Sequence, residues 1–273
     1  MFATPSRPAP TPDRPTTNSW LFPPATQEAQ FDEKWSFVAK KQKQCAATAT
    51  RCGDCWDHVA LDPEHRLVVS VVVGKRTEDN ARQLVYEFRE RTDGRFINLM
   101  TSDEYSAYAA AIGELYDETG PGGSSGGVPE WLVYATVHKT RENNRVVKVD
   151  ARLVFGTLAG LAAALVCAVL GMVNTVFVER SNGTDRHRNG RKARKTYRFS
   201  KDWAVHEAMT YFTLYSANFC WAVRTLREKM GPQRYRQRTP AMAAGLADHV
   251  WRLEEWLLFP SNNRYKLPIY QPN

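Results

Sequence analysis

The sequence predicts an α/β protein in which a mixed sheet is flanked by helices and followed by a C-terminal helical extension. Strand-like and helix-like segments alternate along residues 29–229, which is typical of helices packed on a sheet. The run Leu67–Val73 is apolar and mostly β-branched, as in a strand covered on both faces. The chain has 273 residues and 43% hydrophobic content, which is enough for a large core.

Composition divides the chain into three regions. Residues 1–28 contain seven of the fifteen prolines, and proline opposes both helix and sheet, so we expect an extended, disordered tail. Residues 29–229 form the predicted α/β domain. Residues 230–273 form the predicted helical extension and its tail.

The first half of the domain predicts strands and helices in alternation. Thr77 is a favoured N-cap, and Glu78 and Asp79 suit the first turn of the helix that follows. Gly94 ends that helix. The expected elements are, in chain order, a strand at 31–38, a polar loop at 40–51, a hairpin of strands at 56–61 and 67–73 with the second strand central, the helix after Thr77, a strand at 95–101, and a helix with Tyr105, Tyr108, Ile112 and Leu115 on one face.

In the second half of the chain the predicted strands and helices alternate less regularly. Thr239-Pro240 is a good N-cap and N1 pair, so a last helix is expected from there to about Phe259. Trp251 and Trp256 are expected to pack this helix against the rest of the protein. The other expected elements are a flexible insertion at Thr119–Gly127, strands at Trp131–Val137 and Arg145–Val149, and a core helix at Trp203–Met230.

Residues Leu153–Val178 form an uncharged run of 26 residues. As one helix this run would span about 39 Å, enough to cross a bilayer. Gly171, Asn174 and Thr175 interrupt its later part, and basic residues flank both ends. We therefore favour a short strand, a buried Ala/Leu helix and a loop leading to Glu179, with a membrane span as the less favoured alternative.

Five cysteines without an apolar leader segment favour a reducing, cytosolic setting. Cys52 and Cys55 form a CxxC motif, and with Cys45 and His58 they could be drawn as a zinc site. A single CxxC without a second ligand pair is weak evidence for zinc or for a redox pair. We favour cysteines in a polar loop between strands.

Three acids far apart in the sequence are candidates for one metal centre: Asp32 in a strand-like run, Asp103 after a strand, and Glu179 before the basic tract. Carboxylates from separate elements can hold two divalent cations that act on a phosphodiester. Glu33 and Glu104 adjoin two of these acids, but alternation along a strand points them to the opposite face. The sequence contains no phosphate-binding loop and no GxSxG or HExxH motif, so none of the chemistries that these motifs indicate is predicted.

The segment Arg180–Lys201 contains nine Lys and Arg residues and one acid, Asp185. Solvated faces usually mix both signs of charge, so we favour phosphate contact, in keeping with the net charge of +8. Asn182 and Arg186 follow Glu179 at spacings that share one helix face. The candidate DNA-binding residues are Arg180, Asn182, Arg186, Arg188, Arg191, Lys192, Arg194, Lys195, Arg198 and Lys201.

Five short motifs follow one another along the chain: Asp32-Glu33-Lys34-Trp35-Ser36-Phe37-Val38, Gly74-Lys75-Arg76-Thr77, Ser102-Asp103-Glu104-Tyr105-Ser106-Ala107-Tyr108, Glu179-Arg180-Ser181-Asn182 and Arg194-Lys195-Thr196-Tyr197-Arg198-Phe199-Ser200-Lys201. Each motif is loose alone, but their joint order is specific. In these motifs the chain resembles the DDE transposases of the insertion-sequence-one group. The similarity runs from about Phe31 to Leu226, with weaker likeness at Thr239–Gly245.

The resemblance implies a ribonuclease H-like catalytic domain. Asp32 would lie on the first strand, Asp103 just after the fourth, and Glu179 on a later helix, and together they would be the catalytic and metal-binding residues. Mg²⁺ is the implied cofactor, with Mn²⁺ expected to substitute. The implied reaction is cleavage and strand transfer at the ends of an insertion sequence.

The implied partners are element ends and target DNA, with a homodimer or larger assembly on the DNA and no small-molecule substrate. The implied location is the cytoplasm, at the nucleoid. The alternatives are a stand-alone nuclease of the same fold and a truncated relic that binds DNA without turnover.

The chain departs from this group at its start. Members of the group carry an N-terminal helix-turn-helix or zinc-bearing segment, whereas residues 1–30 show neither helical period nor metal-ligand spacing. We therefore expect a catalytic half, a shortened copy or the second product of a split frame.

Overall fold

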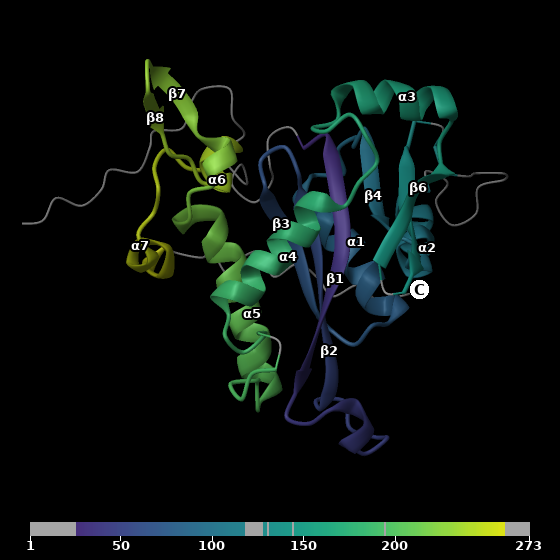
Figure 1. Ribbon diagram of the computed structural model, residues 1–273, viewed down its shortest axis with the longest axis vertical. Helices are drawn as coiled ribbons and strands as arrows, with labels where there is room; N and C mark the ends of the chain where they lie inside the picture. Colours follow the sequence, from purple (N-terminus) through teal and green to yellow (C-terminus); the bar gives the residue numbers. More distant parts are fainter. Residues whose placement is uncertain (1–25, 118–127, 130, 144, 194, 260–273) are drawn as a thin grey trace, which may run out of the picture.

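The centre of the molecule is a six-stranded mixed sheet with the order β3-β2-β1-β4-β5-β6 (Figure 1). The computed structural model describes residues 26–117, 128–129, 131–143, 145–193 and 195–259. β4 pairs in parallel with both β1 and β5, and the other pairs are antiparallel. The strands are β1 (Glu28–Val38), β2 (Gly53–Asp62), β3 (Leu67–Gly74), β4 (Leu99–Asp103), β5 (Tyr134–Glu142) and β6 (Arg145–Phe155). The predicted α/β class with a mixed sheet is confirmed.

Helices cover both faces of this sheet. The helices are α1 (Glu78–Arg91), α2 (Ser106–Leu115), α3 (Leu158–Cys167), α4 (Val176–Arg188) and α5 (Trp203–Cys220). On one face, the Phe31 ring of β1 lies 5.4 Å from Phe88 of α1 and 5.8 Å from Tyr108 of α2. On the other face, Val178 of α4 and Leu214 of α5 are buried against β2 and β3. The sheet is thus the middle layer of three.

The predicted elements of the first half are largely confirmed. The hairpin forms as β2 and β3, and the side chain of Thr77 accepts a hydrogen bond from the Asn80 backbone N–H at the start of α1. β4 ends at Asp103, two residues later than the predicted strand. The predicted tail falls outside the described residues up to position 25, β1 begins at Glu28, and the predicted insertion Thr119–Gly127 also falls outside.

The predicted central position of the Leu67–Val73 strand is wrong, because β3 is an edge strand. It is nevertheless buried along its whole length, since α1 and α5 cover its two faces. Asn218 of α5 lies at the open edge: its Oδ1 accepts from Val68 N at 3.0 Å, and its Nδ2 donates to Val68 O at 2.8 Å. One side chain therefore takes the place of a neighbouring strand.

Replacing Asn218 with leucine is expected to lower the free energy of unfolding by about 2–4 kcal/mol, because a buried backbone donor and acceptor of Val68 lose their partners. Urea unfolding followed by circular dichroism measures the loss. Val205→Ala, at a position of α5 that is 43% exposed, is the matched control and should change stability little. A loss below about 0.5 kcal/mol for Asn218→Leu would contradict this role.

The cysteines of the loop between β1 and β2 do not form a zinc site. Cys45 and Cys52 are joined in a disulfide, which differs from the free thiols predicted for a reducing setting. Cys55 is a buried free thiol on β2. His58 is buried, and its ring nitrogens lie 3.4 Å from the Tyr108 hydroxyl and 3.2 Å from Lys75 O. Cys45 and Cys52 thus lie in the predicted loop, whereas Cys55 and His58 lie on β2, so the prediction that Cys55 belongs to the loop is wrong.

The uncharged run Leu153–Val178 folds as the end of β6, α3 and a connection into α4. The predicted burial of its Ala/Leu helix is wrong. Ala164 is the buried residue of α3, whereas Leu158 is 77% exposed and Val166 is 85% exposed. In the part of the chain that the structure describes, no helix has the length and apolar character needed to cross a bilayer.

The C-terminal region is less helical than predicted. α5 ends at Cys220, well before Met230, and a small hairpin follows it, formed by β7 (Glu228–Gly231) and β8 (Arg234–Arg236). The predicted boundary at residue 230 falls inside β7. Thr239 caps a helix as predicted, but α6 (Pro240–Ala243) is short, and α7 (Leu253–Leu258) is separate from it.

The predicted tryptophan contacts of this region are confirmed. Trp251 lies 4.7 Å from Phe219, and Trp256 lies 5.6 Å from Phe212, between ring centroids. Both phenylalanines belong to α5, so the C-terminal segment packs on that helix.

Candidate metal centre

The three predicted acids meet where β1 and β4 separate. The parallel pairing of these strands extends only to Gln30 and Thr101, and Asp32 and Asp103 follow on the diverging ends. A cavity of about 750 Å³ opens there, and Asp32, Asp103 and Glu179 all line it. Such an opening at the carboxyl ends of parallel strands is a usual place for a ligand site.

Asp32 is oriented by α4. The Asn182 amide Nδ2 donates to Asp32 Oδ2 at 2.8 Å, so the predicted shared helix face of Asn182 and Glu179 does turn toward the acids. Burial, together with the neighbouring Glu33, Asp103 and Glu179 carboxylates, raises the pKa of Asp32 to about 7, although the hydrogen bond from Asn182 lowers it. Asp32 therefore lies where a positive charge would be stabilising.

Asp103 and Glu179 are held by different contacts. Asp103 is the last residue of β4, and its Oδ1 accepts from the Tyr105 backbone N–H at 3.1 Å. Glu179 lies in the first turn of α4, where its Oε1 accepts from the Thr175 hydroxyl at 2.7 Å and forms an ion pair with Lys139 of β5. Glu179 therefore lies on a helix, as the resemblance implied, and not in a loop.

Glu33 lies with the same acids, although strand alternation predicted that it would point away from them. Its Cβ does point to the face opposite Asp32, the face that Phe31 also occupies. Its longer side chain nevertheless brings a carboxylate oxygen into a group with those of Asp32 and Asp103, all within 4.8 Å of one another. Burial raises the pKa of Glu33, the Asp103 carboxylate adds to the shift, and Arg76 opposes it.

The other excluded acid, Glu104, is used elsewhere. It lines the same cavity, but its carboxylate pairs with Arg152 of β6 at 2.7 Å and with His138 of β5. These partners hold it on the β5–β6 side of the site. No signal in the sequence separates Glu33 from Glu104, because each directly follows a predicted catalytic aspartate.

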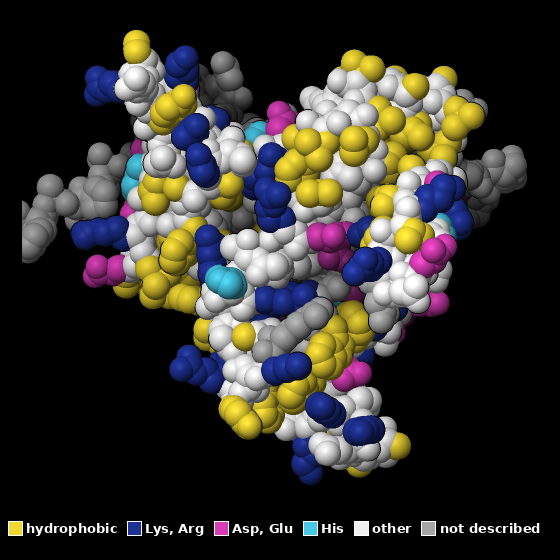
Figure 2. All heavy atoms as spheres, in the orientation of Figure 1, with side chains coloured by type: hydrophobic (Ala, Val, Ile, Leu, Met, Phe, Trp, Pro, Cys, Tyr) yellow, Lys and Arg dark blue, Asp and Glu magenta, His cyan; other side chains and the backbone are white. Residues whose placement is uncertain are grey.

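Positive side chains form the rim of the cavity. Arg76, Lys139, Arg141 and Arg186 line it together with the acids. Figure 2 shows acidic side chains in a hollow between α4 and the β5–β6 hairpin, with Lys and Arg side chains beside them. A surface of this kind can hold an anion next to a bound cation.

The predicted DNA-binding residues separate into several groups. Arg180, Lys195, Arg198 and Lys201 are exposed and Arg191 is half-buried, and Arg186 donates to Trp35 O at 3.4 Å beside the acids. The guanidinium of Arg188 lies 4.4 Å from the Trp221 ring. Asn182 is buried on Asp32, and Arg194 lies outside the described residues.

Lys192 differs from its prediction because its side chain is fully buried. Its Nζ lies 2.8 Å from Asp57 and 3.2 Å from Asp185, and Lys34 pairs with the same two acids. Lys192 is thus withdrawn from any DNA surface. A run of charge in the sequence cannot reveal that one of its members has buried partners.

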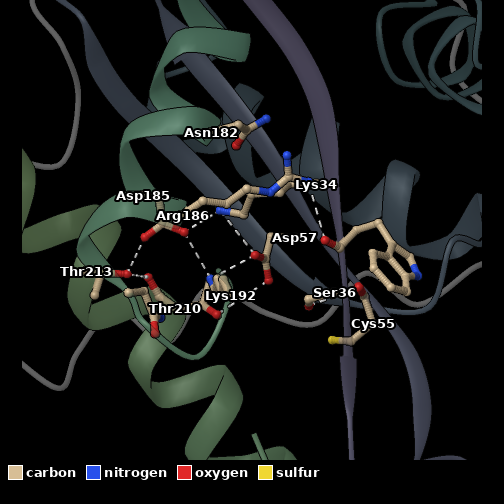
Figure 3. A network of polar contacts seen from close by, with 12 residues as sticks. Lys34, Ser36, Cys55, Asp57, Asn182, Asp185, Arg186, Lys192, Thr210 and Thr213 are labelled. Atoms are coloured by element: carbon tan, nitrogen blue, oxygen red, sulfur yellow. Dashed lines mark hydrogen bonds and ion pairs between the residues drawn. The ribbon is translucent and has the colours of Figure 1, made fainter. Parts of the chain in front are cut away.

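Lys34, Asp57, Asp185 and Lys192 form a buried charge network between β1, β2 and α4 (Figure 3). Burial alone would raise the pKa of Asp57, but the Lys192 and Lys34 ammonium groups hold it well below its usual value. The pKa of Asp185 is likewise lowered against the effect of burial by the same two lysines. The Thr213 hydroxyl of α5 also donates to Asp185, at 2.6 Å.

The network also bears on a second group of potential ligands, Cys55, Asp57 and His206, whose ligand atoms lie within 4.8 Å of one another. Two ammonium groups already contact Asp57, and their positive charge disfavours a further cation there. We therefore assign this group to the charge network and not to a metal site.

Neither the family models nor the curated proteins compared with this chain give a match. The resemblance to the insertion-sequence-one transposases therefore stays a prediction.

Proposed function

We propose that this protein is a DNA transposase with a ribonuclease H-like catalytic domain, which carries out metal-dependent cleavage and strand transfer at the ends of an insertion sequence. The observation that supports this most is the convergence of Asp32, Asp103 and Glu179 on one cavity with a cationic rim. Acids that bind cations, and cations that bind phosphate, are the two parts that phosphodiester transfer needs.

The side chains present fit a divalent cation such as Mg²⁺, for which Mn²⁺ can substitute. Carboxylate oxygens are the ligands that these hard cations prefer, and the raised pKa of Asp32 reflects burial and neighbouring charge that a cation would offset. When bound, two such ions stabilise both the attacking and the leaving oxygen of a displacement at phosphorus. Asn182 orients Asp32, and Thr175 orients Glu179.

DNA is the proposed substrate, and the rim of the cavity is its proposed contact surface. Arg186 and Lys139 line the cavity together with Glu179, and in this proposal they bind phosphate oxygens of the DNA. Because strand transfer joins two element ends, we propose that a homodimer or larger assembly forms on the DNA. The place of action is then the nucleoid.

The test is a strand-transfer assay with the purified protein, Mg²⁺ and linear DNA that carries the sequences flanking its gene. The expected products are cleaved ends joined to target DNA. Hydrolysis without joining would instead indicate a stand-alone nuclease. Steeply salt-dependent binding without cleavage in Mg²⁺ or Mn²⁺ would indicate an inactive relic.

Replacing Arg186 with glutamine is expected to weaken duplex binding and to reduce by about one the slope of log affinity against log salt, because one phosphate contact is lost. Fluorescence anisotropy at several salt concentrations measures this slope. Lys229→Gln removes the same charge from the exposed β7, far from the cavity, and is the matched control. An unchanged slope for Arg186→Gln would contradict the proposed contact.

A further inference from the structure

The compact group of acids in the cavity is not the predicted trio. Oxygens of Asp32, Glu33 and Asp103 lie within 4.8 Å of one another. Glu179 lines the same cavity but is held by Lys139 and Thr175. The structure thus brings the Glu33 carboxylate close to those of Asp32 and Asp103, which alternation along the strand does not predict.

Glu33 has one occupied oxygen and one without a partner. Its Oε1 lies 2.7 Å from Arg76 Nε and 2.5 Å from Arg76 Nη2. Its Oε2 is buried and makes no close hydrogen bond in the described part of the chain, where the Tyr108 hydroxyl is a nearby donor to this carboxylate, and the side chain is only 2% exposed. An unpartnered buried carboxylate oxygen is costly, and more so beside other carboxylates.

Arg76 is itself held in place. Its guanidinium lies 4.1 Å from the Tyr105 ring and 5.2 Å from the Trp56 ring. Arg76 thus fixes Glu33 through Oε1, while a carboxylate oxygen of Glu33 lies within 4.8 Å of oxygens of Asp32 and Asp103. Arg76 thus orients the Glu33 carboxylate, and the Glu33 oxygen that Arg76 does not contact can bind a separate cation.

We propose that Glu33 is a fourth carboxylate of the metal centre and that it binds a divalent cation together with Asp32 and Asp103. Glu179 then contributes from α4, on the other side of the cavity. This inference rests on the metal centre of the proposed function, but not on DNA cleavage or joining. The competing explanation is that Glu33 serves only to anchor Arg76.

The test is Mn²⁺ binding to the full chain without DNA, measured by isothermal titration calorimetry and by electron paramagnetic resonance of free Mn²⁺. Glu33→Gln is expected to weaken binding about tenfold or more, since even groups that only support a ligand change metal affinity by about 10–100-fold. Glu104→Gln removes the same charge beside Asp103 and should leave the affinity unchanged, because Glu104 pairs with Arg152 and His138.

Arg76→Gln separates the two explanations. If Glu33 is a ligand, this variant loses less Mn²⁺ affinity than Glu33→Gln, because it removes a group that orients the ligand but leaves the Glu33 carboxylate in place and removes a competing cation. Wild-type Mn²⁺ affinity in Glu33→Gln would overturn the inference. An equal loss of Mn²⁺ affinity in Arg76→Gln and Glu33→Gln would also overturn the inference, because the Arg76–Glu33 ion pair, and not the Glu33 carboxylate as a ligand, would then determine the affinity.

This test is independent of the outcome for the proposed function. A chain that binds Mn²⁺ through Glu33 but neither cuts nor joins DNA would contradict the transposase proposal and leave this inference standing. A chain that joins DNA, but whose Mn²⁺ affinity does not depend on Glu33, would support the transposase proposal and contradict this inference.

Discussion

Replacing Asp103 with asparagine is expected to slow metal-dependent DNA cleavage about a thousandfold or more, which corresponds to about 4 kcal/mol of lost transition-state stabilisation. Asparagine has nearly the same shape and can still accept the hydrogen bond from the Tyr105 backbone N–H, so the loop after β4 should keep its conformation. The loss then comes from the missing carboxylate charge. Single-turnover cleavage of labelled DNA in Mg²⁺ measures it.

A second measurement distinguishes this effect from misfolding. Without metal, Asp103→Asn is expected to unfold at the same or a higher temperature than the wild-type protein, because the Asp103 charge contributes to the raised pKa values of Asp32 and Glu33. The control is Asp150→Asn on β6, where Asp150 pairs with exposed Lys148; it should cleave normally. Cleavage within tenfold of wild type in Asp103→Asn would contradict the assigned chemistry.

The largest expected effect on stability comes from the buried charge network. Replacing Lys192 with methionine is expected to lower the free energy of unfolding by about 3–5 kcal/mol, because it leaves a buried negative charge without compensation. Among the described residues, Asp57 and Asp185 would then keep Lys34 as their one ammonium partner, with the His206 ring 3.6 Å from Asp57. Urea unfolding at pH 7 measures the loss. Lys148→Met, at a side chain that is 68% exposed in its pair with Asp150, should cost less than about 1 kcal/mol.

The pH dependence of this loss gives a further check. In the wild type the folded pKa values of Asp57 and Asp185 lie below their unfolded values. Their contribution is therefore present above about pH 3.9 and is lost as the pH falls through the folded values. In Lys192→Met, one of the two acids is expected to accept a proton at a higher pH. The stability difference between the two proteins should therefore shrink from pH 7 to about pH 4, and a constant difference would argue against the network.

Part of the site could be predicted from the sequence because its geometry follows from secondary structure. Asp32 lies within β1 just beyond the part that pairs with β4, and Asp103 ends β4, so both lie where these parallel strands separate. Glu33 could not be predicted in the same way. Alternation fixes the direction of a Cβ atom, but not how far a longer side chain reaches where two strands separate.

The fold shows the same limit. The apolar run Leu67–Val73 correctly predicts burial on both faces, but no local pattern tells a central strand from an edge strand that Asn218 covers. The basic tract correctly indicates exposed cations such as Arg198, whereas Lys192 is buried because its partners Asp57 and Asp185 are brought to it by other elements. Contacts between distant segments decide these cases.

The most direct measurement of the central claim is the position of Mn²⁺ in crystals of the protein, found by anomalous diffraction at the manganese edge. We expect anomalous density within coordination distance of Asp32 and Asp103, and a second ion beside Glu179, that disappears in Asp103→Asn crystals. Density at other residues only, or none at saturating Mn²⁺, would contradict a metal-dependent phosphodiester site in this cavity.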